Sequence, residues 1–240
     1  MGIDAVIFDW GGTLTVDEVS LDECLERWRP AAEHLAPDRI DEGADAILAI
    51  ERGWWDRGIA SGRSFTLRQV VAEAADALCV SDPEVVARAE QAHLDAWAAA
   101  VVHDPDAVAV LGALRRRGIR VGLLSNTHWP RDFHEALLER DELHLLIDSR
   151  HYSCDLDHLK PHAGAFRAVL TALGVDDPRR SVFVGDRPID DISGAQALGM
   201  RTVWRPNPHV PAEAHIAPDA TIRALPELLE LIDTWSGLAR

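Results

Sequence analysis

The chain has few cysteines, no long apolar run and no leader-like start. Its three cysteines, Cys24, Cys79 and Cys154, lie far apart, which argues against a disulfide framework or a zinc knuckle and favours a reducing cytoplasm. No run of about eighteen apolar residues is present, so we expect no membrane span. The first residues lack the basic segment and cleavage site of a secretory signal, and we therefore expect a cytoplasmic protein.

Basic residues are also scarce, 24 against 40 acidic residues, which gives a formal net charge of −16. Such a surface repels nucleic acid and anionic membranes, so we expect neither as a partner. An anionic substrate would then need a local positive site, with a metal ion as a natural source of charge. Only one of the basic residues, Lys160, is a lysine. A position that keeps lysine against this bias is expected to need a compact ammonium group that a guanidinium cannot replace.

An apolar run near the N-terminus, Ala5–Phe8, leads directly into Asp9 and then into Trp10-Gly11-Gly12-Thr13. Four β-favouring residues before a carboxylate predict a buried strand that places Asp9 at its C-terminal end. Open parallel α/β sheets bind ligands at this edge, and the two glycines allow the backbone to approach a ligand closely. Asp9 is thus a candidate nucleophile or ligand for a hard cation. Taken alone, the stretch also fits an ordinary strand-to-turn boundary.

Hydrophobic periodicity divides the chain into a helical insert and an α/β core. Between residues 16 and 102 apolar residues recur at helical spacing, without a convincing strand. From residue 103 onwards strands alternate with helices, which predicts a parallel, doubly wound sheet. We therefore expect a Rossmann-like α/β core of residues 1–15 and 103–240 with an inserted α-helical domain of residues 16–102. Helices are expected at 21–35, 42–55, 66–78, 83–100, 106–117, 131–140, 163–173, 192–198 and 226–235, and the later strands at 119–125, 181–185 and 202–204.

Further polar residues follow two of the later strands or precede a helix. Ser125 and Asn126 end one strand, and Asp186 ends another with Asp191 close behind. Lys160 precedes an expected helix, from which its ammonium can reach the same crevice. Carboxylates at two strand ends, with a hydroxyl, an amide and a lysine, are the groups that a Mg²⁺ site facing a phosphate or carboxylate pocket requires.

Taken in this order, these residues resemble the four motifs of the haloacid dehalogenase-like hydrolase superfamily, in the subgroup with a helical cap inserted after the first strand. The first motif, usually Asp-x-Asp-Gly-Thr, is similar to Asp9-Trp10-Gly11-Gly12-Thr13. The second resembles Ser125-Asn126, the third Lys160-Pro161 with Phe166, and the fourth Gly185-Asp186 with Asp191. The resemblance covers the whole chain and implies the same core with an inserted cap.

The resemblance also implies a reaction. Asp9 would attack phosphorus and form an aspartyl-phosphate, and Ser125 and Lys160 would be catalytic by holding the phosphoryl oxygens and offsetting their charge. The implied Mg²⁺ ligands are Asp9, the backbone carbonyl of Gly11, Asp186 and Asp191. We further expect Gly12, Thr13, Asn126 and His128 to contact the substrate on the core side.

The chain departs from the family pattern at Gly11. Phosphatases of this family usually carry aspartate there, which protonates the leaving group and then activates water, and loss of a general acid typically costs about 10²–10⁴ in rate. His128, with Asp17 or a residue of the cap behind it, is the first candidate to replace this acid, although His128 equally fits a packed loop histidine. Alternatively, the substrate has a good leaving group that needs little acid. A third interpretation is a catalytically weak phosphate-binding regulatory protein.

Two other reactions of the superfamily agree less well with the sequence. Carbon–phosphorus bond cleavage needs a lysine in the cap, and the insert contains none. A 2-haloacid dehalogenase carries tyrosine at the position of Gly11 and lacks the acidic fourth motif that Asp186 and Asp191 provide, so it is the less favoured alternative.

In the cap, Trp55 and Arg63 are the candidate substrate contacts, although tryptophan at such a place also fits packing of the cap against the core. The sequence therefore predicts a Mg²⁺-dependent hydrolase of small phosphorylated metabolites, monomeric or homodimeric.

Overall fold

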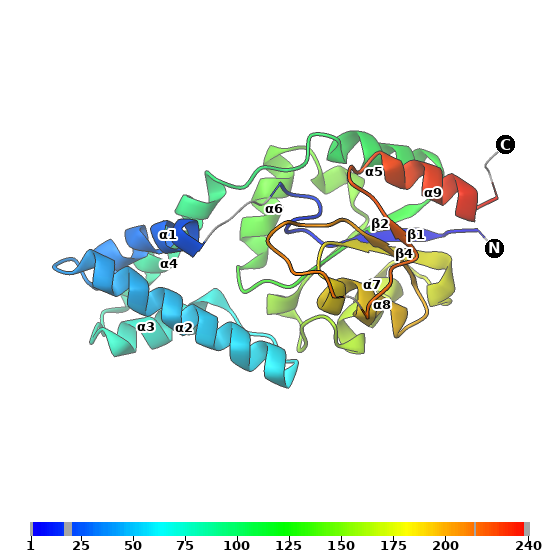
Figure 1. The fold of residues 1–240 in the computed structure, drawn as a ribbon. Helices are drawn as coiled ribbons and strands as arrows, with labels where there is room; N and C mark the ends of the chain where they lie inside the picture. Colours follow the sequence, from blue (N-terminus) through cyan, green and yellow to red (C-terminus); the bar gives the residue numbers. More distant parts are fainter. Residues whose placement is uncertain (1, 17–20, 214, 238–240) are drawn as a thin grey trace.

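The computed structural model describes residues 2–16, 21–213 and 215–237. A parallel sheet lies between helical layers, and four helices form a block beside it (Figure 1). In chain order the elements are β1 (Ala5–Phe8), α1 (Leu21–Leu35), α2 (Ile40–Ser61), α3 (Leu67–Ala77), α4 (Pro83–Ala98), α5 (Ala107–Arg116), β2 (Arg120–Ser125), α6 (Arg131–Arg140), the 3₁₀ turn η1 (His144–Leu146), β3 (Ser149–Tyr152), the 3₁₀ turn η2 (Ser153–Asp155), α7 (Ala163–Ala172), the 3₁₀ turn η3 (Pro178–Arg180), β4 (Ser181–Gly185), the π-helical turn η4 (Pro188–Ser193), α8 (Gly194–Gln196), β5 (Arg201–Trp204), β6 (Ala220–Thr221) and α9 (Glu227–Trp235).

The sheet has the strand order β3-β2-β1-β4-β5-β6, with all neighbours parallel. This arrangement confirms the predicted doubly wound α/β core. At the centre, Phe8 of β1 lies in register with Leu123 of β2 and Val184 of β4. Since the strands are parallel, their carboxyl ends meet at one edge of the sheet, where ligands bind in this class of fold.

Alternate residues of β1 pack into two apolar layers, one on each face of the sheet. Val6 and Phe8 belong to a core cluster with Leu111 of α5, whereas Ala5 and Ile7 pack in a second cluster with residues of α7. Helices α5 and α9 cover one face, and α7 and α8 cover the other (Figure 1). Burial on both faces explains why central strands of this sheet read as continuous apolar runs.

Helices α1 to α4, the helical block, pack around an apolar cluster of their own that includes Trp28, Ile47 and Val70. Local sequence signals define the helix starts. Thr66 and Gln69 form a reciprocal capping box at α3, and Asp82 caps α4 with proline in its first turn. None of the helices in the described ranges is both long enough and apolar enough to cross a membrane.

Two segments join the helical block to the sheet, and they run side by side. Thr15 and His103 form an isolated antiparallel bridge. On either side of it, the N–H of Val16 donates to the carbonyl of Val102 at 2.8 Å, and the N–H of Asp104 donates to the carbonyl of Leu14 at 2.8 Å. The chain therefore leaves the core and returns to it at one place.

The sequence pattern misses two strands and one irregular turn. Strand β3 reads Ser-Arg-His-Tyr and pairs only with β2, so most of its side chains are partly exposed and carry no apolar signal. Strand β6 has only two residues. The helix expected at 192–198 is instead the turn η4 followed by the short α8. At Gly194 a Cβ would come within 2.7 Å of the Phe166 ring, so α8 packs unusually closely on α7.

Candidate active site

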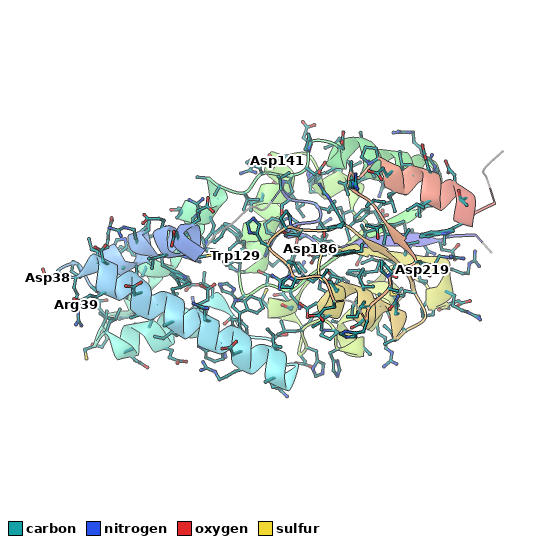
Figure 2. The ribbon with its side chains drawn as sticks, viewed as in Figure 1. Asp38, Arg39, Trp129, Asp141, Asp186 and Asp219 are labelled. Carbon is teal, nitrogen blue, oxygen red and sulfur yellow. The ribbon has the colours of Figure 1, made fainter. Side chains whose placement is uncertain are left out.

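A pocket of about 410 Å³ lies where the carboxyl ends of β1, β2 and β4 face the helical block. Asp9, Ser125 and Asp186 line it from these three strand ends. Trp129 lies near the boundary between the block and the sheet, with Asp186 on the sheet side, and both line the pocket (Figure 2).

Lys160 lies within the pocket with its ammonium group between two carboxylates. Its Nζ donates hydrogen bonds to Asp9 Oδ1 at 2.6 Å and to Asp191 Oδ1 at 2.7 Å. Burial acts to lower the pKa of Lys160, but the carboxylates of Asp191 and Asp9 outweigh burial and hold this pKa above its usual range. Lys160 is therefore a permanent positive charge next to the predicted nucleophile.

Asn126 holds the backbone of Lys160 in place. Its Oδ1 accepts the Lys160 N–H at 2.7 Å, and its Nδ2 donates to the Lys160 carbonyl at 2.9 Å. These two bonds tie the end of β2 to the loop before α7. The side chain of Asn126 thus positions the lysine, a role that the sequence does not indicate.

Three buried carboxylates, those of Asp9, Asp186 and Asp191, offer oxygens within 4.8 Å of one another. Burial is the main cause that raises the pKa of Asp9 to about 8. It outweighs the lowering by Lys160, and the charges of Asp191 and Asp186 add to it. Burial, with a contribution from Asp191, also raises the pKa of Asp186 to about 6. Full ionisation of both Asp9 and Asp186 at neutral pH therefore requires more positive charge than Lys160 supplies.

The trio fits a divalent cation. Asp186 Oδ1 is buried without a hydrogen-bond partner, while Asp186 Oδ2 accepts from Asn207 Nδ2 at 2.9 Å. A buried carboxylate oxygen without a partner is costly, and a hard cation, which prefers oxygen ligands, would satisfy it. Gly11, whose carbonyl is the fourth predicted ligand, also lines the pocket.

Gly12 is a position where only glycine fits. Its φ is +68°, and a Cβ there would lie 2.5 Å from Asp186 Oδ2 and 2.6 Å from Asn207 Nδ2. The turn after Asp9 therefore packs directly against Asp186, the acidic residue that follows β4. The next residue, Thr13, is fully buried and does not line the pocket, unlike Gly12, Ser125 and Asn126.

His128 enters the pocket from the loop after β2 as a packed, neutral side chain. Its ring stacks on Phe65 with centroids 5.7 Å apart and meets the edge of Trp55 at 5.6 Å. Burial lowers the pKa of His128 to about 3. A general acid needs a pKa near the working pH, so in this arrangement His128 does not replace the aspartate that is missing at Gly11.

The other candidates differ in where the structure places them. Trp55, on α2, lines the pocket. Arg63 is exposed beyond the end of α2, where it forms an isolated bridge with His158, and it does not line the pocket. Asp17 lies outside the described residues.

Several pocket residues carry no signal that the sequence motifs reveal. Asn207 follows β5 and could have been found only by extending the strand-end argument to the next strand. Glu51 lies in the middle of α2, Arg187 directly follows Asp186, and His209 belongs to the loop after β5. Their approach to the pocket depends on tertiary packing.

Comparison with known proteins places the chain in a family. It matches the haloacid dehalogenase-like hydrolase family over residues 3–199. A phosphatase from Mycobacterium tuberculosis is 33% identical over 204 residues, which cover 84% of this chain and 86% of that protein. A phosphoglycolate phosphatase from Rhodospirillum rubrum is 35% identical over 203 residues, 83% of this chain and 78% of that protein. The crystal structure of a 2-haloacid dehalogenase from Pseudomonas syringae superposes with a TM-score of 0.70 and 25% identity over 97% of this chain and 99% of that one. On these matches and the site geometry, the chain belongs to the haloacid dehalogenase-like hydrolases.

Proposed function

We propose that this chain is a Mg²⁺-dependent phosphatase of small metabolites that acts through a phosphorylated Asp9. The observation that carries the proposal is the ammonium of Lys160 between Asp9 and Asp191, with the unpartnered oxygen of Asp186 beside them. A dianionic phosphate ester requires such a concentration of positive charge in its transition state. The similarity to two proteins named as phosphatases supports the same reaction class.

In the proposed reaction, a carboxylate oxygen of Asp9 forms a bond to phosphorus while the bond from phosphorus to the ester oxygen breaks. Lys160 and the Ser125 hydroxyl donate hydrogen bonds to the phosphoryl oxygens. Water then attacks phosphorus and releases phosphate and the free carboxylate. Asp9, the Gly11 carbonyl, Asp186 and Asp191 would hold Mg²⁺, which supplies further charge stabilisation when bound.

We further propose that residues 16–102 act as the cap over a core of residues 1–15 and 103–240. The leaving group would depart without help from a protein acid at position 11, because Gly11 has no side chain and His128 is neutral. Esters of acidic alcohols would then react fastest. The acidic trio disfavours a dehalogenase, since displacement of a halide gains little from a divalent cation beside the nucleophile.

The test is hydrolysis of p-nitrophenyl phosphate, acetyl phosphate and a panel of sugar phosphates, each with and without Mg²⁺. We expect phosphate release that depends on Mg²⁺ and falls steeply as the pKa of the leaving group rises. Absence of turnover on every phosphate ester would instead favour a phosphate-binding regulator. Chloride release from 2-chloropropionate without metal would favour the dehalogenase.

A further inference from the structure

The side of the pocket formed by the helical block is aromatic and acidic, and the proposed phosphoryl chemistry does not use it. Trp55 and Trp97 line it from α2 and α4, and Trp129 lines it from the core. The rings of Trp97 and Trp129 lie with centroids 4.9 Å apart. A single carboxylate, that of Glu51, lines the same side.

Glu51 is an enclosed carboxylate, and burial raises its pKa because no permanently charged cation among the described residues offsets the loss of solvent. Only 15% of its side chain is exposed. Its Oε2 accepts a hydrogen bond from Trp28 Nε1 at 2.7 Å. Its Oε1 lies 3.4 Å from His128 Nε2, but His128 is neutral. Over the ranges that the structure describes, no lysine or arginine forms an ion pair with Glu51.

We propose that this side of the pocket binds an ammonium group carried by the leaving group, so that the preferred substrates are phosphate esters of amino alcohols. An ammonium would give Glu51 the counter-charge that an enclosed carboxylate needs. Tryptophan rings attract cations to their faces, and more strongly where water is excluded. A leaving group that carries a carboxylate would instead be repelled by Glu51.

This inference rests on the proposed phosphatase function and extends it to a substrate class. It also agrees with the absence of a general acid at Gly11, because an ammonium on the leaving group would partly offset that absence. A positive charge near the ester oxygen stabilises the negative charge that develops on the departing alkoxide. An amino alcohol therefore leaves more readily than an uncharged alcohol of the same shape.

The experiment compares phosphocholine with 3,3-dimethylbutyl phosphate, its uncharged isostere, and 4-aminobutyl phosphate with n-pentyl phosphate. In the wild-type protein with Mg²⁺, we expect kcat/KM to be about tenfold or more higher for the ammonium member of at least one pair. The second pair tests a longer reach between phosphorus and the ammonium.

Because the ammonium also improves the leaving group chemically, the comparison is repeated in Glu51→Gln. The chemical effect is the same in both proteins, so the change in the ratio isolates the side chain of Glu51. We expect the ratio to fall about tenfold in Glu51→Gln and to stay unchanged in Glu42→Gln, an exposed glutamate of the same helix. A wild-type ratio that Glu51→Gln leaves unchanged for both pairs would overturn the ammonium site.

Failure of the proposed function gives a different result. If p-nitrophenyl phosphate is not hydrolysed with Mg²⁺, the phosphatase proposal fails, and the ammonium site is then tested by binding alone. Tryptophan fluorescence would follow titration with choline and with 3,3-dimethylbutanol. Tighter binding of choline that is lost in Glu51→Gln would support the site, whereas equal binding of the two alcohols would overturn it.

Discussion

Lys160 Nζ and Asp9 Oδ1 lie 2.6 Å apart, although 151 positions separate the two residues in the chain. The contact joins the end of the central strand to the loop before α7, and both side chains are almost fully buried. The ammonium thus lies beside the carboxylate that we propose as the nucleophile. From there it can stabilise the negative charge of that carboxylate and then the charge that develops on a bound phosphoryl group.

Asp9→Asn should abolish turnover while it preserves the fold, because an amide has the shape of the carboxylate but cannot displace the ester oxygen. Initial rates with p-nitrophenyl phosphate and a thermal unfolding curve are the measurements. Phosphate labelling of the wild-type protein that disappears in the variant would support the covalent intermediate. Hydrolysis that persists in Asp9→Asn would rule it out.

Lys160→Arg should lower kcat by about 10²–10³, even though it keeps the positive charge. The ammonium contacts Asp9 and Asp191 in a space from which solvent is excluded, and the planar guanidinium needs a wider one. Arg167→Lys, an exposed change on α7, is the control and should have no effect. Activity of the Lys160→Arg variant close to that of the wild type would show that only the charge matters.

Affinity for Mg²⁺ should increase as the pH rises from about 5.5 to about 8.5. The raised pKa values of Asp9, about 8, and Asp186, about 6, mean that protons must leave these carboxyls before a cation binds. Calorimetric titrations in buffers of different ionisation enthalpy measure both the affinity and the released protons. Binding that is independent of pH and releases no proton would contradict the proposed ligands.

The free energy of unfolding of the metal-free protein should fall as the pH rises. Because the pKa of Asp9 is about 8 in the folded protein and about 3.8 ordinarily, the folded state keeps a proton that the unfolded chain releases. The stabilisation that protonated Asp9 gives to the folded state is complete below the ordinary pKa of about 3.8, and it is lost as the pH rises towards about 8. Mg²⁺ should therefore raise Tm more at pH 8.5 than at pH 6, which thermal scans with and without metal can measure.

Gly12→Ala should weaken Mg²⁺ binding in addition to destabilising the protein. The positive φ alone costs about 1–2 kcal/mol for a residue with a Cβ, and here the Cβ would also strike Asp186 Oδ2. Gly118→Ala is a matched control, since Gly118 has a φ of +75° with no atom within 4 Å of the added Cβ. Unfolding curves should show lower stability in both variants. Mg²⁺ titration should show weaker binding only in Gly12→Ala.

Gly11→Asp should restore a general acid and raise rates most for poor leaving groups, by up to about 10²–10⁴. The measurement is the ratio of kcat/KM for a sugar phosphate to that for p-nitrophenyl phosphate, in the wild type and the variant. A fall in every rate would mean that the glycine itself is required at this position.

The parts of the site at strand ends could be predicted from the sequence, because a buried strand shows in its own residues. Asp9 and Asp186 each follow a run of apolar residues, and parallel pairing brings both to one edge. Lys160 stood out as the single lysine. Glu51 could not be found in this way, because its place on α2 resembles that of other helical glutamates until α2 packs over the core.

The surroundings of individual side chains could not be predicted from the sequence either. The position of His128 next to the second motif suggests an acid, but its neutrality follows from Phe65 and Trp55, which come from the helical block. Arg63, adjacent to a glycine at the end of a helix, suggests a substrate contact, yet the chain there turns towards His158. Strand β3 has a polar sequence because it is an edge strand, so no apolar pattern marks it.

The bridge between Thr15 and His103 brings the two ends of the helical block together. The segment that leaves the core and the segment that returns to it are hydrogen-bonded to each other. The two points at which the block joins the core are therefore adjacent. A block from another protein could be grafted between these two residues without a new path for the core chain. Under the proposed phosphatase function, exchange of the block would change the selectivity for the alcohol and leave the proposed phosphate-binding residues unchanged.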